Sequence, residues 1–117
     1  MMKAGNLDRR ITFQRATFVP NELNEPVETW APIGTFWARR RDVSDGEKEA
    51  AGQVGSTLMS RFTMRNSATM RGIKPTDRIL HDGAVWNIQG IKEADEGRLR
   101  FIEITAIRDA DHGEDDG

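Results

Sequence analysis

The residues of this 117-residue chain that could carry out acid–base or metal chemistry are few and scattered. It has two histidines, His81 and His112, and no cysteine. His81 precedes an Asp-Gly turn sequence, and His112 lies in an acidic, polar C-terminal stretch. A metal site needs ligands held in a fixed geometry, and a polar terminal stretch offers nothing to hold them. We therefore expect no metal site and no thiolate chemistry.

Catalytic patterns are likewise missing from the sequence. It contains no glycine-rich phosphate loop with its lysine and no nucleophile elbow. The acidic pairs Glu47/Glu49 and Asp95/Glu96 lie in hydrophilic segments. Paired catalytic carboxylates need surroundings that push their pKa values apart, which solvated segments do not provide. We expect no catalytic residue, no cofactor and no enzymatic activity.

One basic cluster remains, formed by Arg39, Arg40 and Arg41 in the segment ARRRD. Arginines bind phosphates without reading base sequence, so this cluster could face nucleic acid. Alternatively, it is the end of a strand with two arginines on the solvent face. The aromatic residues fall mostly at alternating strand positions, which favours a core over a base-stacking surface.

Composition indicates one folded domain with much solvated surface, because 31% of residues are charged and 37% are hydrophobic. A chain of this length buries about 65% of its unfolded surface. No apolar run approaches the roughly 18 residues of a membrane span, so we expect no membrane partner. The N-terminus, MMKAGNLDRR, has no apolar core of a secretory signal. The absence of cysteine fits a reducing compartment.

Charge is unevenly distributed along the chain, whose net charge is −2. Residues 109–117 hold five acids and no basic residue, so residues 1–108 carry 17 basic and 14 acidic residues, or +3. We predict a single domain over residues 1–108 and a disordered acidic tail over residues 109–117. The tail is either a contact arm or a solvated terminus.

The first third of the chain has the pattern of strands joined by an elaborate hairpin. Residues 9–15 alternate, with Ile11 and Phe13 on one face, as in a half-buried strand. A polar stretch between two prolines, residues 19–26, predicts a loop. Extended structure restarts at residues 27–30, is interrupted by Pro32 and Gly34, and resumes over residues 35–41.

The second half predicts more strands and a central hairpin. Residues 60–65 are strand-like, residues 66–77 are a connection, and residues 78–91 read as two strands around Asp82-Gly83. That dipeptide suits a type I′ turn and places Ile79 opposite Trp86. Residues 92–98 predict a turn. The last strand, residues 99–107, is apolar in both phases, which favours burial on both faces or a bulge.

Between these halves lies an excursion over about residues 42–60. Ser44 and Glu47 have the spacing of a capping box, so residues 44–54 predict a short helix. An insertion of this length between strands is uncommon and is often functional. Together the elements predict a mainly β fold, a small six-stranded barrel or sandwich with one long inter-strand loop carrying one short α-helix.

The order of these segments resembles the head-tail joining family of tailed bacteriophages, also called head-closure, head-completion or stopper proteins. The resemblance runs from about Gly5 to Ile107. The segments that carry it are GNLDRRITFQR, NELNEPVETW, FWARRR, RFTMR and GIKPTDRILHDGAVWNI. The residues in family register are Gly5, Leu7, Arg10, Ile11, Gln14, Trp30, Arg65, Ile73, Pro75, Arg78, Gly83 and Ile88.

Two positions depart from the family pattern. Asn24 stands where the family usually has glycine, and asparagine tolerates the positive φ that such a turn needs. Trp86 replaces the more common tyrosine or phenylalanine. Neither change alters the expected fold.

The resemblance implies a structural protein rather than an enzyme. Members are small β-barrels that form rings, typically of twelve subunits, below the portal or adaptor ring of a DNA-filled head, and their other face receives the tail. Such proteins occur in phages, prophages and gene transfer agents. The implied location is the virion at the head–tail interface, after assembly in the host cytoplasm.

The resemblance also implies two functional segments. A long loop, here residues 42–60, points toward the channel, where it can gate non-specifically bound double-stranded DNA. Its candidate contacts are Arg39, Arg40, Arg41, Lys48 and Gln53. The hairpin loop would contact neighbouring subunits or the tail. Its candidate contacts are Asn21, Glu22, Leu23, Asn24 and Glu25.

Two alternatives remain open from the sequence. A tail-terminator or adaptor ring of the same neck would share the assembly role. A small β-barrel that binds nucleic acid would instead show salt-dependent binding to free DNA.

Overall fold

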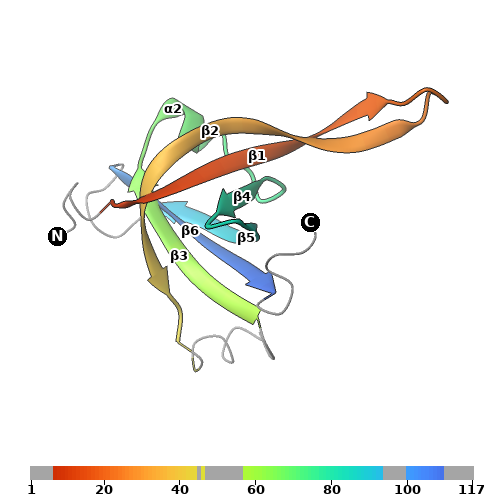
Figure 1. The fold of residues 1–117 in the computed structure, drawn as a ribbon. Coiled ribbons are helices and arrows are strands. Elements are labelled where there is room, and N and C mark those ends of the chain that lie inside the picture. The colour runs from red at the N-terminus through yellow and green to blue at the C-terminus, as the bar shows by residue number, and fades with distance from the viewer. Residues whose placement is uncertain (1–6, 45, 47–56, 94–99, 110–117) are drawn as a thin grey trace.

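The strands of this protein follow the alternating apolar pattern of its sequence. The computed structural model describes residues 7–44, 46, 57–93 and 100–109, and Figure 1 shows their path. The described elements are β1 (Arg9–Pro20), β2 (Pro26–Asp42), β3 (Thr57–Arg65), α2 (Ala68–Arg71), β4 (Arg78–His81), β5 (Ala84–Glu93) and β6 (Phe101–Asp109). Among the described residues, no helix is long and apolar enough to span a membrane.

The six strands form one antiparallel sheet that closes on itself in the order β1-β2-β3-β6-β5-β4. Closure depends on a short contact, in which Thr12 to Gln14 of β1 pair with Arg78 to Leu80 of β4. Within the barrel, closing the sheet removes the exposed edges that would otherwise invite aggregation. The predicted mainly β fold with six strands is confirmed.

A long two-stranded arm, residues 15–31, extends from the barrel (Figure 1). It arises because β1 and β2 stay paired from Arg9↔Ala38 to Pro20↔Pro26, far beyond their contacts with other strands. Ile33 forms a bulge, since Phe13 pairs with Gly34 and Gln14 with Pro32. Bulges bend a strand and increase its twist, so this one separates the barrel part of the hairpin from the arm.

The predicted loop over residues 19–26 is therefore too long, and the predicted break at Pro32 and Gly34 is wrong. β2 runs unbroken for 17 residues, and only residues 21–25 connect it to β1. Pro32 lies in the part of β2 that pairs with β1 alone, because pairing with β3 begins at Ala38. A proline at such an edge interrupts no second ladder of hydrogen bonds.

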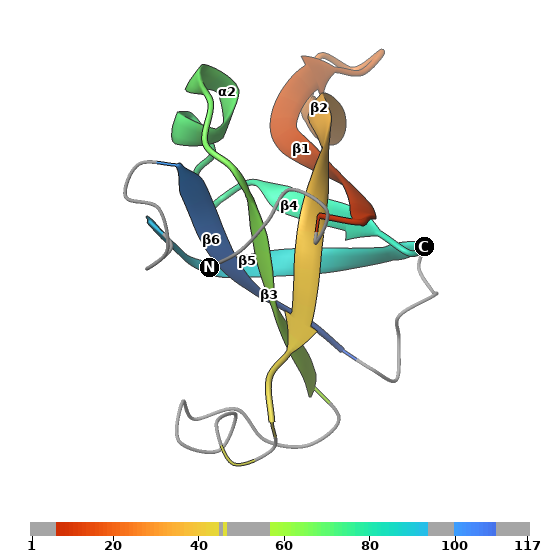
Figure 2. The same cartoon turned by 90° about the vertical axis from the view of Figure 1, so that its left-hand side faces the viewer.

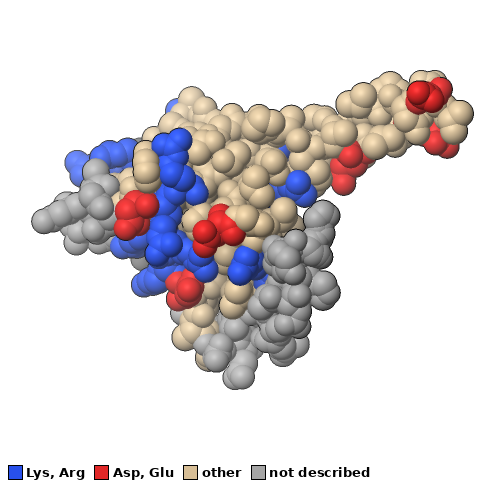
Figure 3. Space-filling model, viewed as in Figure 1, with Lys and Arg blue, Asp and Glu red and all other residues tan. Residues whose placement is uncertain are grey.

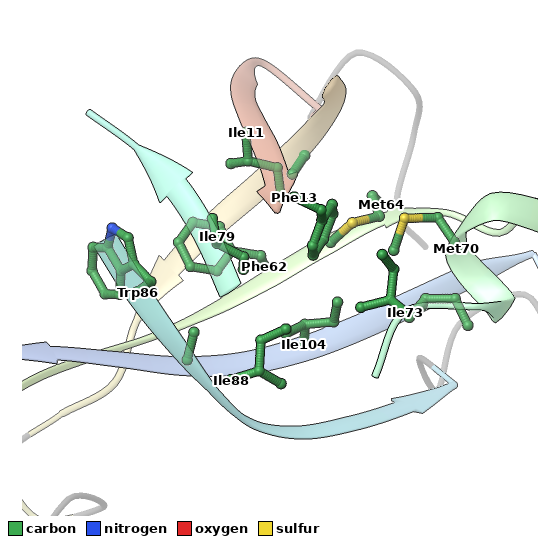
Figure 4. Close-up of a cluster of buried hydrophobic side chains, with 13 residues drawn as sticks. Ile11, Phe13, Phe62, Met64, Met70, Ile73, Ile79, Trp86, Ile88 and Ile104 are labelled. Atoms are coloured by element: carbon green, nitrogen blue, oxygen red, sulfur yellow. The ribbon is translucent and has the colours of Figure 1, made fainter. Parts of the chain in front are cut away.

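The barrel interior is filled by apolar side chains from all six strands and α2. The cluster consists of Ile11, Phe13, Ala38, Phe62, Met64, Met70, Ile73, Ile79, Trp86, Ile88, Ile102, Ile104 and Ala106. Figure 4 shows Met70 and Ile73 at one end of this cluster and Trp86 at the other. The helix therefore plugs one end of the barrel, and the tryptophan lies near the opposite end.

The helix that makes this plug was not predicted. Residues 66–77 were expected to form a connection without regular structure. Instead, Ser67 is the N-cap of α2, and its hydroxyl oxygen accepts a hydrogen bond from the Met70 N–H at 3.1 Å. A four-residue helix has too few residues to show an apolar period. Its stability comes from the burial of Met70, which is 1% exposed.

The central hairpin matches its prediction. Asp82 and Gly83 have φ values of 60° and 75°, as a type I′ turn requires. His81 pairs with Ala84, and Ile79 pairs with Trp86. Both members of the second pair are fully buried, so this hairpin supplies the barrel with a large part of its core.

Replacing Gly83 by alanine is expected to lower the free energy of unfolding by about 1–2 kcal/mol, the cost of a left-handed conformation for a residue with a Cβ. Gly90→Ala is the matched control, since its φ lies outside the left-handed region and a Cβ at either position meets nothing within 4 Å. Urea denaturation measures both. Equal effects would contradict this explanation of the turn.

The last strand has one face in the barrel and one face outside it. Ile102, Ile104 and Ala106 are buried in the main cluster, whereas Phe101 packs against Leu7 in a second, smaller cluster. The apolar pattern of this strand had predicted either burial on both faces or a bulge. The burial of Phe101 on the outer face agrees with the first explanation. The bulge lies in the neighbouring strand, where the β5–β6 register shifts between Ile88 and Gly90.

Three predictions concern residues outside the described part of the chain. Most of the helix predicted over residues 44–54 lies there. So does most of the turn predicted over residues 92–98, and so does all but the first residue of the acidic tail.

Candidate functional site

The three clustered arginines do not share one surface. Side chains alternate along a strand, and Ala38 faces the interior, where it is fully buried. Arg40 therefore points to the interior side, while Arg39 and Arg41 point outward. The Arg40 side chain is only 17% exposed. Its Nε donates a hydrogen bond to Asp42 Oδ1 at 2.9 Å, so its role within the barrel is structural.

Arg40 also helps to close the barrel end that leads into the 42–60 excursion. Its guanidinium lies 5.0 Å from the centre of the Trp86 ring, and that of Arg108 lies 5.2 Å from the same ring. A guanidinium over a tryptophan is attracted by the negative face of the ring. Arg40 Nη1 lies 3.5 Å from His81 Nε2. This end of the core is therefore covered by charged side chains stacked on an aromatic ring.

A polar pair ties the two strands together where the 42–60 excursion leaves the barrel. Asp42 pairs with Ser60 in the β2–β3 register, and the Ser60 hydroxyl donates a hydrogen bond to the Asp42 carboxylate. This bond, aided by Arg40, lowers the pKa of Asp42 despite the opposing effect of burial. One residue further out, the Val43 N–H donates to the Met59 carbonyl at 2.9 Å. Hydrogen bonds therefore join the end of β2 to the start of β3 where the 42–60 excursion begins, and we call this paired point, at Asp42 and Ser60, the root of the excursion.

The outward arginines lie beside further positive charge. Arg41 is directly opposite Arg61 in the β2–β3 register. Within the described residues, neither Arg39 nor Arg41 forms an ion pair. Figure 3 shows basic side chains gathered over the barrel. Lys48 and Gln53, the other candidate DNA contacts, lie outside the described residues.

The arm ends in a rigid turn. Asn21 Oδ1 accepts hydrogen bonds from the N–H groups of Leu23 and Glu25, both at 2.9 Å. Asn24 has a φ of 62°, which confirms the expectation that asparagine tolerates the turn here. The side chains of Glu22 and Leu23 are exposed at this tip.

The arm exposes apolar side chains at Leu23, which was predicted as a contact, and at Phe18, Val19 and Val27, which were not predicted. The exposed fractions are 65% for Phe18, 52% for Val19, 77% for Leu23 and 42% for Val27. Residues 16–31 contain three glutamates and no lysine or arginine. Apolar side chains grouped on an exposed surface mark an interaction site. The arm is thus an acidic, apolar surface carried away from a basic barrel.

An ion pair fixes the base of the arm to the plugged barrel end. Arg15 donates from Nε and Nη2 to the two carboxylate oxygens of Asp77, each at 2.9 Å, and from Nη2 to the Gly72 carbonyl at 2.8 Å. Asp77 Oδ2 also accepts from the Lys74 N–H at 2.8 Å. The Asp77 side chain is 1% exposed. This bidentate geometry gives the arm a defined direction.

Asp77 is ionised in this setting. Burial alone would raise its pKa, but hydrogen bonds from Arg15 and from the Lys74 N–H, together with the Arg15 charge, hold the pKa below its ordinary value. Arg15 and Asp77 are 62 positions apart, so no local sequence pattern could have paired them.

A second contact supports the other side of the arm base. Arg78 Nε donates to Gln14 Oε1 at 2.8 Å, and its guanidinium lies 4.0 Å from the centre of the Trp30 ring. Gln14 and Trp30 belong to β1 and β2, and Arg78 begins β4. The arm is therefore braced against the barrel by both of its strands.

The described residues show no arrangement suited to metal binding, since none of their His, Asp and Glu side chains form a group of three or more. His81 Nδ1 lies 3.0 Å from the Arg10 carbonyl, and its ring packs edge-on against Phe62 at 5.5 Å. These contacts make His81 a part of the scaffold.

Comparison with known structures supports this description of the fold. The solution structure of protein SF1141 from Shigella flexneri 2a is 31% identical to the chain, with a TM-score of 0.65, and the match covers 90% of this chain and 95% of that one. A chain from the virion of a native gene transfer agent particle is 20% identical, with a TM-score of 0.61, and the match covers 86% and 93%. No curated protein sequence matches the chain.

The decisive comparison is with protein families. The family model described as phage head completion protein matches residues 2–109, a range that includes the barrel, the arm and the 42–60 excursion. The chain therefore belongs to the phage head completion protein family.

Proposed function

We propose that this protein is a connector subunit at the head–tail junction of a tailed bacteriophage, prophage or gene transfer agent. Copies of it form a ring, expected to hold twelve subunits, below the portal or an adaptor ring. The ring closes the DNA-filled head and offers its other face to a tail terminator or tail-tube protein. The observation that carries this proposal is the family match over residues 2–109.

The architecture supports a role in assembly. The braced arm and the paired ends of β2 and β3 at Asp42 and Ser60 lie at different places on a small barrel (Figure 1), and the arm exposes apolar side chains such as Leu23. In an isolated subunit the arm side chains meet only water, whereas neighbouring subunits would cover them. The likeness to a chain of a gene transfer agent virion agrees with the fold of such a subunit.

Heads that contain DNA but lack this protein and the tail test the proposal. We expect them to bind the purified protein at a fixed number of copies, measured by sedimentation and quantitative gel analysis. Heads that already carry tails are the control and should bind none. No binding to the tailless heads would contradict the proposal.

The outward arginines provide the proposed contact with packaged DNA. Arg39 and Arg41 lie just before the root of the 42–60 excursion and point to the outer side of the sheet, where Arg41 is exposed and Arg39 is half-buried. We leave Arg40 out of this proposal because its side chain donates to Asp42 and lies over the Trp86 ring. Contacts of this kind are independent of DNA sequence.

Replacing Arg39 and Arg41 together by alanine is expected to increase DNA leakage from closed, tailless heads while the protein still assembles on them. If both side chains contact phosphates, the log–log salt slope of DNA binding falls by about 1.8. Nuclease sensitivity of the heads measures leakage. Arg71→Ala, an exposed arginine on α2, is the matched control. Unchanged retention with normal assembly would rule out this contact.

A further inference from the structure

The barrel has an apolar hollow on the side where the chain enters β1. The hollow has a volume of about 550 Å³ and is lined by Leu7, Asp8, Phe36, Trp37 and Arg65. Its most prominent side chain is Trp37, which is 52% exposed. A half-exposed tryptophan in a hollow is unusual for a surface that meets only water, because aromatic side chains are typical anchors of protein interfaces.

Positive charge surrounds this hollow. The Arg10 guanidinium lies 4.7 Å from the centre of the Trp37 ring. Arg65 lines the hollow and lies 6.0 Å from the centre of the Phe101 ring. Both arginines are exposed. Among the described residues that line it, Asp8 is the one acid, and its carboxylate lies 3.8 Å from Arg9. The hollow is therefore an apolar site with a mainly basic rim.

The arm tip has the complementary chemistry. It exposes Phe18 and Leu23, and its charges are those of Glu22, Glu25 and Glu28. Its turn is held rigid by Asn21, so little conformational freedom would be lost on docking. The tip is acidic and the rim of the hollow is basic, so the two surfaces are complementary in charge. Both also expose apolar side chains that can pack together.

The arm of a subunit lies far from the hollow of the same subunit. Asp8 lies immediately before β1, and the tip turn follows its last residue, Pro20. A strand of 12 residues spans about 36 Å. Figure 2 views the side where β1 begins, and the arm extends away behind it. Docking within one subunit is therefore excluded by distance, whereas a second copy can bring the two surfaces together.

We propose that the arm tip of one copy docks in the hollow of the next copy around the ring. This inference rests on the proposed function and names the contact that joins the subunits. Leu23 and Phe18 would meet the apolar wall around Trp37, and the glutamates would lie near Arg65 and Arg10. A contact between two different surfaces of the same chain is heterologous, and repeating it produces a ring when the rotation closes.

Disulfide cross-linking tests this contact cleanly, because the chain has no cysteine of its own. The test variant carries Leu23→Cys on the arm tip and Asp8→Cys at the hollow, and is oxidised after assembly on tailless heads. We expect trimers and larger covalent species in a non-reducing gel. Each single variant can form dimers at most. A variant with Leu23→Cys and Val85→Cys, which has an exposed site outside the hollow lining, is the matched control.

Two results would overturn the proposal. One is a test variant that yields no species beyond those of the single variants, and the other is Leu23→Cys cross-linking to a different virion protein. If tailless heads still bind the protein in that case, only the arm–hollow contact is wrong. If the heads do not bind unmodified protein at all, the proposed function itself fails.

Charge exchange provides an independent readout. Glu22→Arg is expected to weaken subunit association on the heads, and adding Arg65→Glu to the same chain should restore it at least in part, because the pair then has reversed but opposite charges. Additive losses in the double variant would contradict the proposed pairing of arm and hollow.

Discussion

Replacing Phe62 by alanine is expected to lower the free energy of unfolding by about 3–5 kcal/mol, the usual cost of truncating a buried phenylalanine. Phe62 is fully buried. Its ring packs edge-on against Trp86 at 5.3 Å and against His81 at 5.5 Å. The surrounding strands are hydrogen-bonded into a closed sheet, so they can do little to fill the space left behind.

The control for this prediction is a second phenylalanine. Phe18→Ala removes the same atoms from an arm side chain that is 65% exposed, and its effect on the isolated protein should be within about 0.5 kcal/mol. Urea denaturation of both variants measures the difference. Equal losses would mean that the arm, and not only the barrel, contributes to the cooperative core.

Replacing Asp77 by alanine is expected to cost about 1.5–3 kcal/mol of unfolding free energy, the range for hydrogen bonds to a charged group. The Asp77 carboxylate accepts hydrogen bonds from Arg15 and from the Lys74 N–H. Alanine has no acceptor at this position, so these donors lose their hydrogen-bond partner. Asp8→Ala, which removes a carboxylate whose side chain is 71% exposed, should change stability by less than about 0.5 kcal/mol. A loss for Asp77→Ala no larger than that of the control would contradict the anchoring role.

The same carboxyl group should make stability depend on pH in a defined direction. Because folding lowers the pKa of Asp77, its contribution is fully present above the unfolded value of about 3.9. It is lost as pH falls through the lower, folded value. The stability difference between the unmodified protein and Asp77→Ala should therefore be largest near neutral pH and shrink below about pH 4. A difference that stays constant down to pH 2 would show that the Asp77 charge is not involved.

The sequence predicted the barrel well because its signals are local. Alternation placed Ile11 and Phe13 in the core, and Asp82-Gly83 specified a turn that fixes the register of Ile79 against Trp86. These rules depend only on neighbouring residues and on the two-residue period of a strand. An open sheet of these strands would leave two edge strands with unpaired backbone groups, and closing the sheet pairs those two strands with each other.

The arm could not be predicted from the same signals. Prolines at positions 20, 26 and 32 and the polar residues of the turn are typical of a loop, but here they lie at strand ends or at an edge. The contacts that hold the arm join residues far apart in the sequence. Arg15 donates to Asp77, and Arg78 donates to Gln14 and lies over the Trp30 ring. No spacing rule connects residues so distant in the sequence.

The structure separates the residues that sequence analysis grouped in the candidate site. The arginine cluster was identified, but only the strand phase separates the inward Arg40 from the outward Arg39 and Arg41. The hairpin segment, with Leu23, was identified through a family resemblance, whereas the apolar side chains of Phe18, Val19 and Val27 became apparent only from their exposure. The match to the phage head completion family confirms the expected structural role in the virion.

The most direct test of head closure uses DNA-filled heads made without this protein and without tails. Purified protein is added, followed by nuclease and then by free tails, and the tailed particles that retain DNA are counted by electron microscopy. We expect heads that receive the protein to keep their DNA and join tails, and heads without it to do neither. Heads that retain DNA and join tails equally well without the protein would contradict this expectation.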